Sequence, residues 1–409
     1  MDNLTSSSTV TKAHVKAPKH RIGNPLPAMP WAFDDDHDAW RETMRAFCRD
    51  RVAPGAADRS IQAHYDADLV REVAELGAFG LLLPEPHGAG ADLRTLCITV
   101  EELAYVDSSL AVTTHVAAVS AYLLAKLIED RPDLHSELVP QLASGEIMAC
   151  FGLTEPSGGS DAANVDTVAR RDGDGWILDG AKQFITNSGT PLTKYAVVFA
   201  RTGGNEDRRA VSAFLVPLDT PGVTVAPAYQ KLGWRASDTH PIFLDSVRLP
   251  ASALLDREGN GMARALGMLT WARIPFAAIG LGLARACLDE TIRFASDRTS
   301  FGSRLIDHQS VGFRLAQMAA DTATAGLQTY DAAWKYDHGR PYDVEAASSK
   351  LVATEIANQV AYEATQLHGG YGFVLESAVT RHYQDARVLT IAEGTSEVQR
   401  MLLARWLTP

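Results

Sequence analysis

Prolines interrupt the middle of the chain at intervals that no long helix tolerates, and this feature constrains the fold most. Proline lacks a backbone donor and clashes with the preceding helical turn, so it rarely lies inside a helix. The prolines concerned are Pro217, Pro221, Pro227, Pro241 and Pro250. Short apolar runs around them alternate with turn dipeptides such as Asp179–Gly180, a pattern typical of β-strands. We therefore predict a β-domain, built as a small barrel or sandwich.

Both flanking regions instead carry apolar residues at helical spacing. Trp40 and Met44 recur at the period of one helix face before the β-domain, and Leu281, Ala284 and Leu288 do so after it. Long stripes of this kind are typical of helical bundles. The predicted class is α+β, with a leader and three domains. The boundaries are a disordered leader over 1–32, a helical domain over 33–149, the β-domain over 150–258 and a helical bundle over 259–409.

The two ends of the folded part carry recognisable helix starts. The acidic cluster at Asp34–Asp36 indicates a helix N-terminus, where negative charge is favoured. The alternative, a metal site at Asp34 and His37, finds no second ligand group nearby in the sequence. Ser396 with Gln399 three residues later is predicted to form a capping box that starts the last helix.

Composition excludes several classes of function. The 409 residues carry a formal net charge of −12, which disfavours nucleic acid as a partner. We expect no membrane span, because no apolar run approaches the ~18–20 residues required. The leader is rich in Ser, Thr, Lys and Pro and lacks the apolar stretch of a secretory signal. The four cysteines are scattered, which predicts neither disulfides nor a zinc site and fits a reducing cytoplasm.

Two segments of the β-domain combine hydroxyls with glycines or an aromatic residue. The first runs from Phe151 to Asp161 and the second from Lys182 to Ser188. Glycines let backbone N–H groups approach a ligand, and hydroxyls can donate to a ring nitrogen or carbonyl. Each segment alone could equally be a surface loop. A dinucleotide fingerprint at Gly280–Gly282 is disfavoured, because it lacks the third glycine and follows no predicted strand.

Together with motifs in the flanking regions, these segments resemble the acyl-CoA dehydrogenases from about residue 40 to 407. The resemblance implies a β-barrel domain between N-terminal helices and a C-terminal four-helix bundle, assembled as a homotetramer or homodimer. The residues that carry it are Glu101–Ala104, Leu153–Asp161, Phe184–Asn187, Arg298–Gly302, His308–Gln309, Gln366–Gly372 and Glu393–Arg400.

The resemblance implies FAD as the cofactor and no metal. One set of residues would line the flavin from the same subunit, and the other would complete the site, in part from a neighbouring subunit. The first set is Phe151, Leu153, Thr154, Ser160, Phe184 and Thr186. The second is Arg298, Ser300, Phe301, His308, Gln309, Gln366, Gly369, Gly370, Thr395 and Glu397. The family usually has Trp at the Phe184 position, so the indole N–H is missing here.

Glu393 aligns with the catalytic base of most dehydrogenases in the family. A carboxylate in a dry pocket has a raised pKa and becomes a stronger base toward the α-C–H of a thioester. The alternative is that Glu393 caps the last helix. Predicted substrate contacts are Ser160, Thr270, Arg273, Tyr371 and Gly394. Thr270 replaces an acidic residue of the family, so an acyl-carrier-protein thioester is an alternative to acyl-CoA.

The predicted function is FAD-dependent oxidation of acyl-CoA to trans-2-enoyl-CoA in the cytoplasm, with an electron-transfer flavoprotein as electron acceptor. Three alternatives remain: an oxidase that uses oxygen, an acyl-carrier-protein dehydrogenase of a biosynthetic pathway and a non-catalytic FAD-binding scaffold. Glu393 argues against a flavin monooxygenase, since such enzymes on this fold generally lack the base. Acyl chain length is left open.

Overall fold

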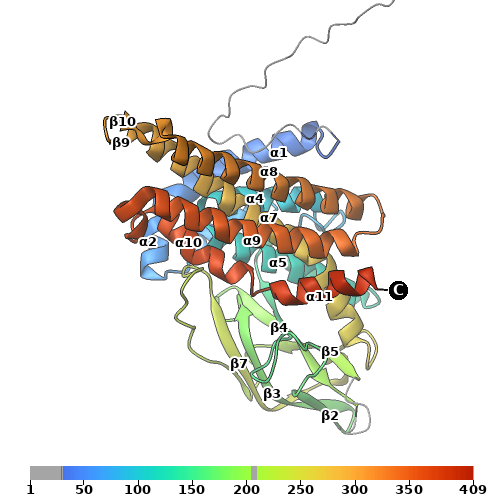
Figure 1. Ribbon diagram of the computed structural model, residues 1–409. Coiled ribbons are helices and arrows are strands. Elements are labelled where there is room, and N and C mark those ends of the chain that lie inside the picture. Colours follow the sequence, from blue (N-terminus) through green and yellow to red (C-terminus); the bar gives the residue numbers. More distant parts are fainter. Residues whose placement is uncertain (1–28, 30, 204–209, 409) are drawn as a thin grey trace, which may run out of the picture.

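The computed structural model describes residues 29, 31–203 and 210–408. Along the chain, a mixed sheet lies between a helical N-terminal region and a helical C-terminal region. Figure 1 shows that the sheet extends from one side of the helical body. This arrangement confirms the predicted order of helices, strands and helices. The predicted leader lies almost wholly outside the described residues, but Met29 and Ala32 at its end are buried in the core.

In the N-terminal region α4 packs against α1 and α5, and α4 is apolar along most of its length. Asp34 caps α1 by accepting a hydrogen bond from the His37 backbone N–H at 3.1 Å, which confirms the helix start expected from the acidic cluster. A π-turn at Cys48–Val52 and a 3-10 turn at Ala53–Gly55 follow α1 directly. The helices are α1 (Asp35–Phe47), α2 (Ala56–Gln62), α3 (Ala67–Glu75), α4 (Leu93–Val106), α5 (Ser108–Leu127) and α6 (Pro132–Ser144).

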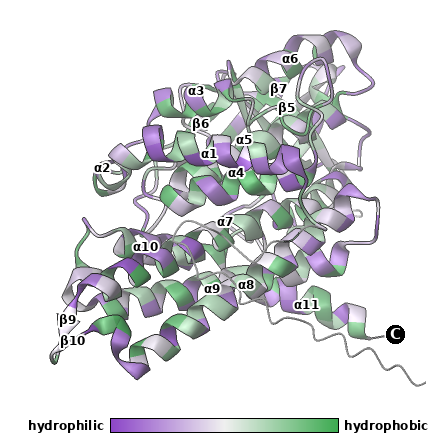
Figure 2. Cartoon of the chain, turned by 90° about the horizontal axis from the view of Figure 1, so that it is seen from above, coloured by the Kyte–Doolittle hydropathy of each residue, from purple (hydrophilic) through white to green (hydrophobic). Residues whose placement is uncertain are grey.

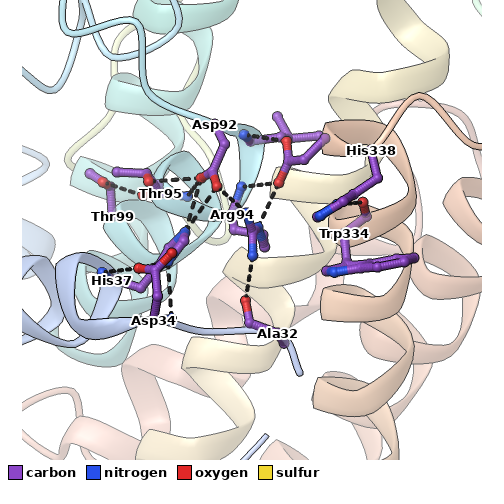
Figure 3. A network of polar contacts seen from close by, with 11 residues as sticks. Ala32, Asp34, His37, Asp92, Arg94, Thr95, Thr99, Trp334 and His338 are labelled. Carbon is purple, nitrogen blue, oxygen red and sulfur yellow. Dashed lines mark hydrogen bonds and ion pairs between the residues drawn. The ribbon is translucent and has the colours of Figure 1, made fainter. Parts of the chain in front are cut away.

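A polar network holds the start of α1 against the start of α4, as Figure 3 shows. The His37 ring lies between two carboxylates, 2.6 Å from Asp34 and 3.0 Å from Asp92. Arg94 links Asp92 to Asp337 at the end of α8. These side chains therefore bind one another, and the described residues contain no group of three or more His, Cys, Asp or Glu suited to a metal.

The middle region is one mixed sheet of eight strands with the order β6-β7-β3-β2-β4-β5-β8, and β1 pairs with β4. Its strands are β1 (Met148–Gly152), β2 (Val168–Asp172), β3 (Gly175–Thr186), β4 (Thr193–Arg201), β5 (Val211–Pro217), β6 (Val223–Val225), β7 (Thr239–Leu249) and β8 (Leu254–Leu255). Most pairs are antiparallel, whereas β1 and β2 run parallel to β4. The strand path of the described residues is open between β6 and β8, so the mixed sheet is confirmed but the predicted barrel is not shown to close.

The C-terminal region is a bundle of long helices, in which α9 packs against α7, α8, α10 and α11. These elements are α7 (Gly261–Asp297), α8 (Gln309–Asp337), α9 (Asp343–His368), α10 (Ala378–Leu389) and α11 (Ser396–Leu407). The short hairpin of β9 (Thr299–Ser300) and β10 (Ser303–Arg304) projects from one corner of the molecule (Figures 1 and 2). Hydrophilic and hydrophobic residues alternate along the outer helices α8, α9 and α10, as the colours of Figure 2 show.

Two helices, α5 and α7, are long and apolar enough to cross a membrane by length and composition. The expectation that no apolar run approaches this length was therefore wrong. In the structure 83% of the apolar window of α5 and 78% of that of α7 are buried inside the protein. Both helices are apolar because neighbouring elements surround them, as expected of helices at the centre of a large core.

Candidate active site

The turn between α10 and α11 presents Glu393 in a conformation that side chains rarely adopt. Glu393 has a φ of 53° and Gly394 a φ of 86°, both left-handed. For a residue with a Cβ this conformation costs about 1–2 kcal/mol. The Gln399 amide donates to the carbonyl oxygens of Glu393 at 3.3 Å and Gly394 at 2.9 Å. Lys350 of α9 donates to the Gly394 carbonyl at 2.7 Å.

The structure replaces the predicted Ser396–Gln399 capping box with a different cap. The N-cap of α11 is Thr395, whose side chain accepts from the Val398 backbone N–H at 3.3 Å. The Gln399 side chain is directed to the preceding turn instead, since two carbonyls there need donors. Thr395 thus lies beside Glu393 as a helix cap.

The Glu393 side chain is half-buried, and nearby positive charge compensates this burial only in part. Its Oε2 atom is buried and has no hydrogen-bond partner among the described residues. Burial raises the pKa of Glu393, and the positive charges of Arg273 and Lys350 only partly offset that rise. Arg273 is itself 9% exposed, and its Nε is buried without a partner in the described structure. A carboxylate in this environment is a stronger base than one in water.

The two hydroxyl-rich segments of the β-domain lie side by side. The Gln183 backbone N–H donates to the Thr154 carbonyl at 2.9 Å. Lys182, fully buried, lies 2.6 Å from a Glu155 carboxylate oxygen and 3.4 Å from the Leu153 carbonyl. Glu155 also accepts from the backbone of Thr167 at 3.0 Å. This buried ion pair joins the segments that carry Thr154 and Thr186.

The aromatic residues of these segments differ in exposure. Phe184 has a φ of 58° and is 61% exposed, and its ring lies 5.0 Å from that of Tyr229. Phe151 is half-buried against Phe199, with 5.0 Å between ring centroids. Ser160 lies in an exposed part of the glycine-rich loop. An exposed aromatic face beside hydroxyls can accept a flat heterocycle.

A cavity of about 520 Å³ opens between the end of α7 and the end of α9. Its wall contains Arg298, Ser300, Gln366, Gly369, Gly370 and Tyr371 among the residues predicted to bind ligands. Tyr371, predicted as a substrate contact, therefore groups with the predicted cofactor residues. A side chain added at Gly369 or Gly370 would meet no atom within 4 Å, so the backbone there leaves open space.

The remaining predicted residues lie beside this cavity or on α7 and α11. His308 donates through its Nε2 to the Ser300 carbonyl at 3.0 Å, which braces the hairpin. Phe301 is 98% exposed, and Gln309 begins α8 on the surface. The Thr270 hydroxyl donates to the Leu266 carbonyl at 2.8 Å within α7. Glu397 lies exposed in the first turn of α11.

The cavity suits a phosphate-bearing cofactor such as FAD. The guanidinium of Arg298 offers donors in a fork that matches phosphate oxygens. The glycines supply approachable backbone, and Phe294 and Tyr371 add apolar wall. These properties, together with the hydroxyls near Phe184, match a ligand with a flat ring system and a charged linker.

Comparison with known proteins identifies the class that this fold and site define. Three family models match in succession: the acyl-CoA dehydrogenase N-terminal domain over residues 34–146, the middle domain over 150–247 and the C-terminal domain over 259–408. The chain therefore belongs to the acyl-CoA dehydrogenase family and is an enzyme of that class.

Individual relatives cover nearly the whole chain. A probable acyl-CoA dehydrogenase of Bacillus subtilis is 38% identical over 372 residues, which are 90% of this chain and 96% of the relative. Butyryl-CoA dehydrogenase from Megasphaera elsdenii has a TM-score of 0.87 and 34% identity, covering 92% of this chain and 98% of its own. Glutaryl-CoA dehydrogenase from Mycobacterium smegmatis in complex with FADH2 has a TM-score of 0.87 and 32% identity, covering 93% and 96%.

Sequence reasoning missed the buried groups that support these segments. Lys182 and Glu155 lie within the two hydroxyl-rich segments, but no role was predicted for them, and Lys350 and Gln399 were not assigned to the site. One signal could have found Lys350, because it falls on the apolar stripe of α9 with Ala346 and Ala353. A lysine at a core position needs an acceptor or counter-charge, which points to a buried polar contact.

Proposed function

We propose that the protein catalyses FAD-dependent α,β-dehydrogenation of an acyl-CoA to the trans-2-enoyl-CoA, with Glu393 as the base. The observation that carries the proposal is the half-buried Glu393 carboxylate, whose buried Oε2 atom has no hydrogen-bond partner in the described structure. A helix-capping carboxylate would accept from backbone N–H groups, whereas the cap here is the Thr395 side chain.

In this mechanism the protein positions the substrate and moves one proton. Glu393 abstracts the α-proton, which the thioester carbonyl has made acidic, and desolvation raises its basicity for this step. Arg273 and Lys350 supply positive charge that offsets part of the rise in the pKa of Glu393. FAD, when bound, would accept the β-hydrogen as a hydride.

We assign the flavin ring to the Thr154 and Thr186 segments, with Phe151, Leu153, Ser160 and Phe184 around it. The rest of the cofactor would meet the cavity residues, including Arg298 and Gln366, of a neighbouring subunit. Exposed aromatic residues beside that cavity support a covering subunit, since Phe301 is 98% and Phe373 89% exposed. The proposed assembly is a homotetramer or homodimer.

The proposed substrate is a CoA thioester, consistent with the butyryl-CoA and glutaryl-CoA dehydrogenases among the similar structures. Ser160, Arg273 and Gly394 would line its path, and Thr270 would take the position of an acidic residue. A cytoplasmic electron-transfer flavoprotein is the proposed electron acceptor.

Anaerobic bleaching of the bound flavin tests this function. Straight, branched and aromatic acyl-CoA thioesters, and the same acyl groups on a carrier protein, are mixed with the yellow protein, and absorbance near 450 nm is followed. We expect bleaching with at least one CoA thioester, and a loss of about 10²–10⁴-fold in its rate in Glu393→Gln with FAD retained. Rapid reoxidation by air alone would favour the oxidase, and no bleaching with any thioester would favour the scaffold.

A further inference from the structure

Lys350 is a buried ammonium whose acceptor is a backbone carbonyl rather than a carboxylate. Its side chain is fully buried in α9, and its Nζ lies 2.7 Å from the Gly394 carbonyl oxygen. The Phe276 ring lies on another side, 5.6 Å from Nζ. Burial of a charge is costly unless strong contacts compensate it, so this lysine needs a reason beyond packing.

The carbonyl that Lys350 holds belongs to the turn that carries the proposed base. Glu393 and Gly394 are both left-handed, and their carbonyl oxygens face the core of the bundle. Gln399, fully buried, donates to both carbonyls from α11. Two donors from two helices thus hold a strained turn of two residues, since its conformation is unfavourable for Glu393 without external contacts.

We propose that Lys350 is a positioning residue that fixes the left-handed turn carrying Glu393 and sets, through its charge, how readily that carboxylate takes a proton. The inference rests on the proposed function, because it concerns the base of that reaction. Gln399 shares the first role without the second, since an amide donates a hydrogen bond but carries no charge.

Two positively charged side chains act on the Glu393 carboxylate, and Lys350 is one of them. Arg273 approaches from α7 and Lys350 from α9. The negative charges of Glu355 on α9 and Glu397 on α11 act in turn on Lys350. Both carboxylates are exposed, so solvent screens their charge. Asp343 acts on Arg273. Removal of the Lys350 charge should therefore make Glu393 harder to ionise.

The rate at which substrate α-hydrogens exchange with solvent measures proton abstraction by the base, and this measurement does not require reduction of the flavin. The FAD-loaded protein is incubated in D2O with a 3-thiaacyl-CoA, which has α-hydrogens but sulfur at the β position, so no hydride can leave. NMR follows replacement of the α-hydrogens across pH. The variants are Lys350→Met, which removes donor and charge, and Gln399→Leu, which removes the donor alone. Lys335→Met, at a half-buried ion pair between α8 and Glu345 of α9, is the control.

We expect the maximal exchange rate of Lys350→Met to fall about 10–100-fold, because small misplacement of a reacting group is costly. Its acid limb should also move to higher pH. Gln399→Leu should lower the rate with the acid limb unchanged, and Lys335→Met should match the parent protein. The KM for acyl-CoA should change less than kcat in both site variants, because the turn acts on the chemical step.

The outcomes separate this inference from the proposed function. Exchange that persists in Glu393→Gln overturns both. Exchange lost in Glu393→Gln but unchanged in rate and pH profile in Lys350→Met overturns the positioning role alone. If Lys350→Met does not retain FAD, Gln399→Leu decides, and a rate within about twofold of the parent overturns the inference.

Discussion

Two groups of buried charge in this molecule are built on opposite principles. At the centre of the helical body Arg41, Glu101, Glu102 and Arg285 form a cluster that we call the core ion cluster. Glu101, 0% exposed, accepts from Arg41 at 3.0 Å and also from Arg285 and Tyr330. At the other group, the turn of Glu393, one carboxylate oxygen has no partner in the described structure.

The pKa values of the two glutamates move in opposite directions. Burial alone would raise the pKa of Glu101, but Arg41 and Arg285 outweigh it and lower that pKa below its usual 4.5. Burial raises the pKa of Glu393, and Arg273 and Lys350 do not cancel it. Pairing of both Glu101 oxygens ties helices together, whereas incomplete pairing of Glu393 leaves a carboxylate able to take a proton. Under the proposed mechanism, the fully buried Glu101 stabilises the fold, and the half-buried Glu393 acts in catalysis.

The largest expected effect is on the core ion cluster. Glu101→Gln leaves Arg41 and Arg285 short of a buried counter-charge and should lower the free energy of unfolding by about 3–5 kcal/mol. Urea unfolding at pH 7 measures this. The control Glu42→Gln, at an exposed pair with Arg45, should change it by less than about 0.5 kcal/mol. A loss below about 1 kcal/mol in Glu101→Gln would show that the cluster contributes no net pairing energy.

The Lys182–Glu155 pair should affect both stability and cofactor binding. It is buried like the core ion cluster, and it lies beside the proposed flavin segments. Lys182→Met should cost about 2–3 kcal/mol, since Glu155 keeps its backbone donors. It should also reduce FAD retention after gel filtration. Lys194→Met, a surface lysine of the same domain, is the control. Full FAD retention in an unstable Lys182→Met would assign the pair to folding alone.

Arg298→Ala should affect cofactor binding without affecting either buried group. Its guanidinium lines the cavity but is exposed, so we expect about tenfold weaker FAD binding and little change in the unfolding midpoint. Flavin content after dialysis measures the first and thermal unfolding the second. Arg304→Ala, in the hairpin that follows Arg298 and paired with Asp307, is the control. Equal flavin content in both variants contradicts the assignment of the cavity to FAD.

The smallest expected effect is that of Glu393→Gln on stability, below about 1 kcal/mol and in the stabilising direction, because a neutral amide replaces a desolvated carboxylate.

Proton linkage gives the sign of the pH dependence of stability for each of the two glutamates. A raised folded pKa means that the folded chain binds more protons, so stability from Glu393 falls as pH rises from 4.5 through that pKa. A lowered pKa means that stability from Glu101 rises with pH up to 4.5. The free energy of unfolding of Glu393→Gln and of Glu101→Gln, measured against pH and compared with the parent protein, checks these opposite dependences. The same change in pH dependence in both variants would contradict the contrast between the two glutamates.

The sequence by itself determined the order of helices, strands and helices, because hydrophobic periodicity and proline are local properties of the chain. The acidic start of α1 was predictable for the same reason, since a cap involves neighbouring residues. The family motifs placed Glu393, Thr154 and Arg298 in one kind of site, and the family models match the same order.

Only the tertiary structure decided how these residues are supported. Lys350 reaches the Gly394 carbonyl across 44 positions of sequence, and Lys182 meets Glu155 across 27. It also decided that Thr395 caps α11 and that the strand path of the sheet stays open. Such contacts depend on how helices and strands pack, and local sequence carries no signal for a donor and an acceptor that meet only after folding.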